Sequence, residues 1–212
     1  MAVYDLEEQE KLSALQAWWE AYGKYVTAIV TALCVTIIAV QGWRWYTRAQ
    51  SEKAAVLYSA ISQAAVTSGL DKAKDAGAQL LDKYPGSAYA ARGALLLAKL
   101  AVDANDNELA KSRLQWVIDR ASEDELKQIA RLRLAYILLD GKAYDDALRM
   151  LDAKHDENFD GLYADAKGDI LAAASKPVEA RAAYQAALLK LDPKGSYRNF
   201  VQLKIDSLGE PK

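Results

Sequence analysis

One stretch of the sequence is apolar all round, whereas elsewhere apolar residues recur at helical spacing among polar ones. Nineteen residues, Tyr25 to Trp43, contain no charged side chain and lie between Lys24 and Arg44. A helix of that length reaches roughly 28 Å, close to the ~30 Å hydrocarbon core of a bilayer. Aromatic residues gather at both ends, as they do where rings meet lipid headgroups. The pattern predicts a transmembrane helix over residues 25–43.

Two alternatives to a retained signal anchor explain less of this stretch. A buried helix of a soluble core would need cover on every face, and it leaves the aromatic and basic ends without a role. A cleaved signal peptide would begin with 24 residues that include acids such as Asp5 and Glu20, and bulky residues would stand where small ones are expected.

The charges beside the span do not fix its orientation. Lys11 and Lys24 precede it, and Arg44, Arg48 and Lys53 follow it. The positive-inside rule therefore favours a cytoplasmic carboxyl-terminal part by one residue. That difference leaves the topology open.

Residues 1–24 read as a short amphipathic segment, because apolar residues recur there at three- and four-residue steps. The segment is either a docking or interfacial helix or an extension of the transmembrane helix. Inside the span, small residues lie near one face, where another helix could approach closely in lipid. Alternatively, these residues are the ordinary content of a span. The small residues are Ala28, Ala32 and Ala39.

Beyond a juxtamembrane linker at 44–51, a repeat runs through residues 52–208. Four central alanines follow one another at intervals of 37, 37 and 33 residues. Twelve residues before each of the last three stands a small residue, and four residues after it stands a large one. Two helices can pack closely antiparallel only where neither carries a bulky side chain. The alanines are Ala73, Ala110, Ala147 and Ala180, the small residues Ala98, Ala135 and Gly168, and the large ones Leu114, Leu151 and Tyr184.

This repeat resembles the tetratricopeptide repeat, a helix–turn–helix unit with small residues at those places. It departs from that pattern because Lys167 stands where Leu97 and Leu134 are apolar. Ser122 to Glu125 fit a capping box, and Pro177 fits the first turn of a helix. We predict an all-α chain, in which one transmembrane helix precedes a tetratricopeptide-like α-solenoid. Its helix pairs cover 52–84, 87–120, 123–155 and 159–191, and a closing helix covers 196–208.

Little in the composition points to chemistry. The net charge is −2, and no basic patch favours nucleic acid. Cys34 is the only cysteine and His155 the only histidine, so an intrachain disulfide is impossible and a soft metal site is not expected. No glycine-rich phosphate loop, nucleophile elbow or Cys–His pair is present. The sequence therefore predicts a protein that is not an enzyme and needs no cofactor.

A tetratricopeptide-like array would carry a groove lined by the first helix of each pair. Its candidate residues are apolar in the middle and charged at the ends, which suits an extended or helical chain segment. Alternatively, many of the apolar ones are inter-helix core. The candidates are Arg92, Leu95, Lys99, Val102, Ile129, Leu132, Tyr136, Leu139, Leu162, Asp165 and Asp169.

The whole chain resembles the YfgM family, the ancillary subunit of the bacterial Sec translocon. The resemblance rests on YDLEEQEKLSALQAWWEAYGKYV before the span, GWRWY at 42–46 and the degenerate repeats. It implies a single-pass inner-membrane protein with a cytoplasmic amino terminus and a periplasmic repeat domain. It also implies association with the SecYEG channel, the periplasmic chaperone PpiD and emerging polypeptides, with residues 25–43 in lipid. On topology we follow the resemblance, because long domains translocate largely regardless of charge.

Two other functions remain open from the sequence alone. The repeat domain could belong to a regulatory adaptor that sequesters a cytoplasmic or membrane signalling protein. It could also belong to an envelope-assembly scaffold. The side of the membrane that the domain occupies separates the adaptor from a secretion partner.

Overall fold

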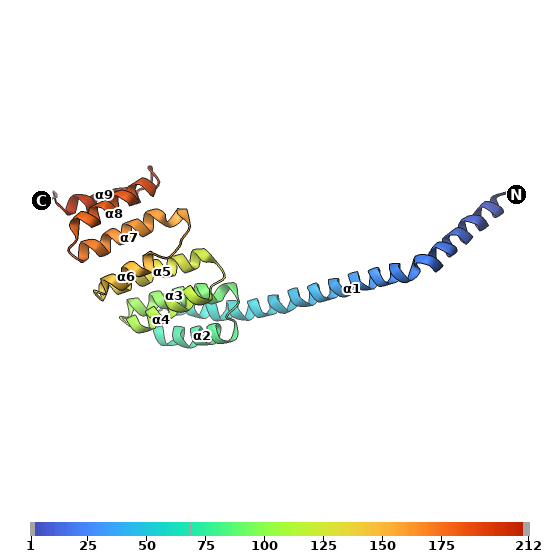
Figure 1. Cartoon of the computed structure of the whole chain (residues 1–212). Helices are drawn as coiled ribbons and strands as arrows, with labels where there is room; N and C mark the ends of the chain where they lie inside the picture. Colours follow the sequence, from blue (N-terminus) through green and yellow to red (C-terminus); the bar gives the residue numbers. More distant parts are fainter. Residues whose placement is uncertain (1–2, 68, 210–212) are drawn as a thin grey trace. The chain divides into compact units, whose positions relative to one another are not determined.

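The computed structural model describes residues 3–67 and 69–209, with side chains from residue 10 onward (Figure 1). Over these residues the chain is helical and has no strand, so the all-α prediction is confirmed. Ser68, at a predicted turn, lies outside the described residues. The elements are α1 Val3–Val66, α2 Leu70–Lys83, α3 Ala88–Asp103, α4 Asn107–Arg120, α5 Asp124–Asp140, α6 Tyr144–Leu151, η1 Glu157–Phe159, α7 Asp160–Ala173, α8 Pro177–Lys190 and α9 Tyr197–Ser207.

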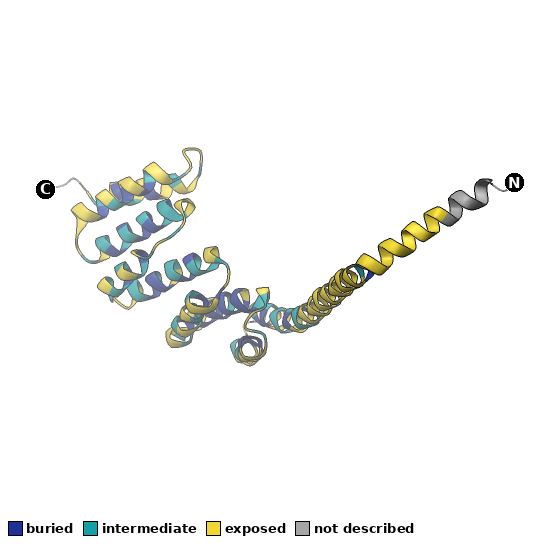
Figure 2. Ribbon diagram, turned by 45° about the vertical axis from the view of Figure 1, so that its right-hand side comes forward, coloured by how far each residue is buried: buried dark blue, intermediate teal, exposed yellow. Residues whose placement is uncertain are grey.

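The chain forms two compact units, Met1–Gln50 and Ser51–Lys212. The first unit is helical through the predicted span, and the apolar side chains of residues 25–43, apart from the half-buried Val26, are exposed (Figure 2). Thr36 donates its hydroxyl proton to the carbonyl of Ala32 at 2.8 Å, so this polar group is satisfied within the helix. Helix α1 is long and apolar enough to cross a membrane. Residues 44–51, the predicted linker, are helical too.

The second unit is a stack of antiparallel helix pairs. The carboxyl-terminal part of α1 precedes α2, and the pairs α3–α4, α5–α6 and α7–α8 follow, with α9 packed on α8 (Figure 1). These pairs agree with the ranges predicted from the repeat. Each pair buries its apolar face against its neighbours, so the core runs along the stack as a series of clusters.

Close contacts explain the small residues of the repeat. A Cβ added to Gly168 would lie 2.4 Å from the ring of Tyr184, so α7 and α8 touch there. Ala98 and Ala110 are buried at the equivalent crossing of α3 and α4. The size of these side chains therefore sets how closely the two helices of a pair approach each other.

The turn inside each of the last three pairs has the same backbone conformation. Asn105, Lys142 and Ser175 have φ angles of 60°, 58° and 61°, and each stands five residues before a central alanine of the repeat. The amide that follows each of them bonds the carbonyl five residues back, as Asp106 bonds Ala101 at 2.8 Å. This is a Schellman motif, which closes the first helix and starts the return.

The predicted helix starts have different outcomes. Pro177 is the first residue of α8, as predicted. The capping box at 122–125 is wrong, because Glu123 occupies the N-cap of α5 and no side chain caps that helix. The carboxylate of Glu123 instead accepts two hydrogen bonds of 2.7 Å from Arg92 on α3. The Glu123 carboxylate thus joins two successive helix pairs instead of capping its own helix.

Candidate interaction surface

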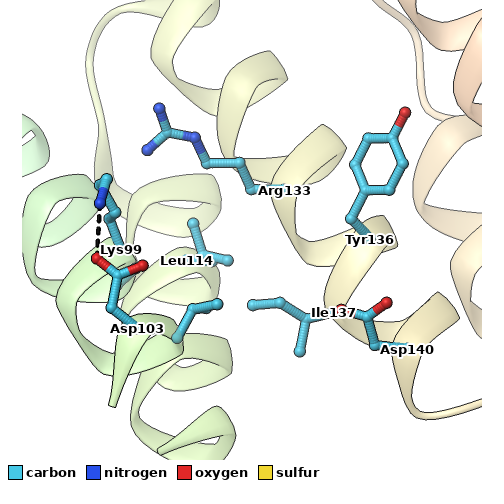
Figure 3. A pocket seen from close by; sticks show the side chains of 9 residues that line it. Lys99, Asp103, Leu114, Arg133, Tyr136, Ile137 and Asp140 are labelled. Carbon is cyan, nitrogen blue, oxygen red and sulfur yellow. Dashed lines mark hydrogen bonds and ion pairs between the residues drawn. The ribbon is translucent and has the colours of Figure 1, made fainter. Parts of the chain in front are cut away.

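A pocket of about 330 Å³ opens between α3 and α5, the first helices of two successive pairs (Figure 3). Its floor is apolar, and Figure 3 shows Ile137 pointing toward Leu114 across it. The ring of Tyr136 points to the other side of α5. The lining residues are Ala98, Lys99, Val102, Asp103, Leu114, Arg133, Tyr136, Ile137 and Asp140.

Helix α5 supplies one wall of the pocket. Arg133, Tyr136, Ile137 and Asp140 stand at positions i, i+3, i+4 and i+7, so they form one stripe along the helix. Arg133 and Asp140 lie at the two ends of this stripe. Seven residues rise roughly 10 Å along a helix, which is the distance that separates the two Cα atoms along its axis.

The charges on the two walls differ in their partners. On α3, Lys99 and Asp103 pair with each other at 2.6 Å and largely neutralise that wall. On α5, the guanidinium of Arg133 reaches the carbonyl of Leu95 at 3.4 Å, which directs it toward α3. Among the ion pairs of the described residues, none includes Arg133 or Asp140.

Three of the predicted groove residues line this pocket. They are Lys99, Val102 and Tyr136. The stripe predicted on α5 comprises 129, 132, 136 and 139, whereas Arg133, Ile137 and Asp140, which the prediction lacks, lie on the neighbouring stripe. The i, i+3, i+4, i+7 spacing of charge, aromatic ring, apolar side chain and charge was the signal that could have found them.

Other predicted groove residues lie elsewhere. Leu95 is buried in the core between α3, α4 and α5, and Asp165 is fully buried, so for these two the prediction of a surface contact is wrong. Tyr197 and Lys204 of α9 cover Asp165. Arg92 is exposed but paired with Glu123. The remaining apolar candidates, Ile129, Leu132, Leu139 and Leu162, are half-buried.

Asp165 and Asp169 belong to a network that fastens the closing helix. Lys204 of α9 donates to both oxygens of Asp165 at 2.9 Å and to Asp169 at 2.8 Å. The hydroxyl of Tyr197 donates to Asp165 at 2.6 Å. Asp169 also accepts from Tyr136 and Tyr184, at 3.0 and 2.8 Å. Each donor in this network has a carboxylate acceptor, and each carboxylate accepts from several donors. The network is therefore structural and joins α5, α7, α8 and α9.

The network changes the proton affinity of its members. Burial, and then the nearby carboxylates, raise the pKa values of Tyr136, Tyr184 and Tyr197 well above their ordinary value of 10.0. Burial alone would lower the pKa of Lys204, but its bonds to Asp169 and Asp165 outweigh that effect and raise it above 10.5. The neutral phenols and the charged lysine are thus the forms that the fold stabilises.

His155 has structural partners. Its ring stacks on Tyr163 with centroids 4.1 Å apart, and its Nε2 lies 3.2 Å from the carboxylate of Asp160. In the part of the chain that the structure describes, no three His, Cys, Asp or Glu residues gather as a metal site would require.

Comparison with known proteins agrees with this architecture. The family described as a tetratricopeptide repeat-like domain matches residues 16–210, so the chain is a tetratricopeptide repeat-like protein with an amino-terminal apolar helix. Three relatives are each named "Ancillary SecYEG translocon subunit". The protein from Neisseria gonorrhoeae is 33% identical over 96% of this chain and 98% of its own length. Those from Escherichia coli and Haemophilus influenzae are 28% and 27% identical, over 98% and 87% of this chain and 99% and 90% of their own. The chain belongs to the YfgM family of ancillary SecYEG translocon subunits.

Proposed function

We propose that this protein is a membrane-anchored interaction module of the Sec translocon that has no catalytic role. Relatives named ancillary SecYEG translocon subunits align with this chain over nearly its whole length, and this supports the proposed association with the translocon. The open pocket between α3 and α5 carries the proposal that the repeat domain binds polypeptide. Pockets on the first helices of repeat pairs suit extended or helical segments, because they offer apolar contacts between charged ends.

In this proposal residues 25–43 cross the bacterial inner membrane once and contact lipid. Residues 1–24 lie in the cytoplasm, residues 44–51 connect the anchor to the repeats, and the repeat domain lies in the periplasm. Its partners are the SecYEG channel, the periplasmic chaperone PpiD and polypeptides that emerge from the channel. Anchoring holds the pocket near the channel exit, which raises its effective concentration toward those partners.

Within the span, Ala28, Ala32 and Ala39 are the proposed contacts with a partner helix. All three are exposed in this structure. Small side chains let two helix backbones approach closely in lipid, where packing replaces the hydrophobic effect as the driving force.

Site-specific photo-crosslinking of the full chain in living cells tests the proposal. A photo-reactive amino acid at Val102, a pocket residue that is 39% exposed, should cross-link to the translocon, the chaperone or a chain in transit. The same substitution at Val178, which is exposed on α8 outside the pocket, is the matched control. Equal cross-linking from both positions, or none from Val102, would contradict a binding role for the pocket.

Protease treatment of spheroplasts tests the topology. The repeat domain should be digested from outside while the inner membrane is intact. Protection, in a preparation where a periplasmic control protein is cut, would place the domain in the cytoplasm. That outcome would favour the regulatory adaptor over the secretion partner.

A further inference from the structure

The α3–α5 pocket carries one positive and one negative end, and both belong to α5. The Lys99–Asp103 pair on α3 is closed on itself at 2.6 Å, so it contributes little net charge to the pocket. Arg133 and Asp140 have no such partner among the described residues, and both are exposed. Between them lie the apolar floor and the side chain of Ile137 (Figure 3).

The stability of helix α5 does not explain why a charged residue stands at position 133 or 140. Asp140 is the last residue of α5, where the negative end of the helix dipole disfavours an acid, and the last turn holds no basic residue to offset it. Arg133 makes one long hydrogen bond, to Leu95, and this bond directs its guanidinium to the pocket. Two charges that belong to no ion pair among the described residues therefore lie at the two ends of the α5 wall of the pocket.

We infer that this pocket selects extended polypeptide segments that carry an acidic and a basic residue about three positions apart, on either side of apolar residues. The inference rests on the proposed polypeptide-binding role of the same pocket and adds its sequence preference. The acidic residue pairs with Arg133 and the basic residue with Asp140, while an apolar side chain enters the cavity.

The spacing follows from chain geometry. A polyproline-II-like segment has three residues per turn and rises about 3.1 Å per residue, so residues i and i+3 share one side roughly 9 Å apart. That distance is similar to the rise between Arg133 and Asp140 along α5. A cavity of about 330 Å³ also exceeds the ~150 Å³ that holds a benzene in an engineered cavity, so an aromatic ring has room.

Four labelled peptides and the full chain in phosphatidylcholine nanodiscs test this preference by fluorescence anisotropy. The peptides share a central Leu-Phe, which is flanked by Asp and Lys, by two Gln, by two Asp or by two Lys. The unmodified protein should bind the Asp/Lys peptide about tenfold more tightly than the Gln/Gln peptide, at roughly threefold for each exposed ion pair. The difference should shrink as salt is added.

Charge reversal on the protein should change the order of preference. Arg133→Glu makes both ends acidic, so the Lys/Lys peptide should become the tightest ligand. Asp140→Lys makes both ends basic, so the Asp/Asp peptide should become the tightest. Arg120→Glu and Asp82→Lys change the net charge equally at exposed positions outside the pocket, and they should keep the original order.

Three results would overturn the inference. One is an unchanged order of preference in Arg133→Glu and Asp140→Lys. Another is equal binding of all four peptides, which would leave the pocket as a polypeptide site without charge selection. The third is the absence of binding by any peptide. In each case the cross-linking from Val102 decides separately whether the proposed function stands.

Discussion

Lys204 is the residue whose loss should most weaken the attachment of the closing helix α9. Lys204→Met keeps most of the side-chain stem but removes the charge that compensates Asp165, whose side chain is fully buried. Breaking a buried ion pair from one side costs about 3–5 kcal/mol. We expect about 3 kcal/mol, because the Lys204 side chain is 32% exposed and Tyr197 still donates to Asp165.

Hydrogen exchange of the full chain in detergent micelles measures this loss. If α9 opens locally, about 3 kcal/mol corresponds to exchange on the order of 100-fold faster for amides in residues 197–207. The matched control is Lys167→Met on α7, which breaks a solvent-exposed pair with Asp152 at the end of α6. That pair is worth about 0.5 kcal/mol, so exchange in α9 should be nearly unchanged.

A double substitution separates lost attraction from an uncompensated charge. Asp165→Asn/Lys204→Met removes both members, so it should destabilise α9 less than Lys204→Met alone. The reasoning would be refuted if Lys204→Met exchanged like the Lys167→Met control. A double variant less stable than the single one would refute it as well.

Three further predictions concern pH, packing and turns. The free energy of unfolding should fall above pH 10, by up to about 1.4 kcal/mol per pH unit for each phenol, because the unfolded chain releases protons that Tyr136 and Tyr184 retain when folded. Unfolding measured at pH 9 and 11 tests this, and Tyr184→Phe should reduce the dependence of stability on pH. Gly168→Ala should lower the free energy of unfolding, measured by urea titration, by about 1–3 kcal/mol, because its Cβ would meet the Tyr184 ring at 2.4 Å. In the control Gly86→Ala the added Cβ meets nothing within 4 Å, so the free energy of unfolding should change little. Lys142→Gly should raise the melting temperature, because Lys142 has a φ of 58° that costs a side chain about 1–2 kcal/mol, and no gain on this substitution would contradict the assignment of that turn.

The apolar helix and the helix pairs could be predicted from the sequence because their signals are local. An uncharged run of membrane length needs no knowledge of neighbours. The spacing between Ala98 and Ala110, and between Gly168 and Ala180, records packing within one helix pair, where contacts repeat with the chain. The all-α architecture and the pair boundaries followed from these patterns.

Which side chains are exposed to solvent and which are buried followed only from the tertiary structure. Asp165 resembles a groove residue by its position on α7, yet Lys204, 39 residues later, and Tyr197 cover it. The left-handed turn falls on Lys142, although Gly141 stands beside it. Arg133 and Asp140 line one pocket only because α3 packs against α5. Local pattern fixes the helices and their partners in a pair, but the burial of a side chain depends on residues distant in the sequence, whose positions only the packed stack defines.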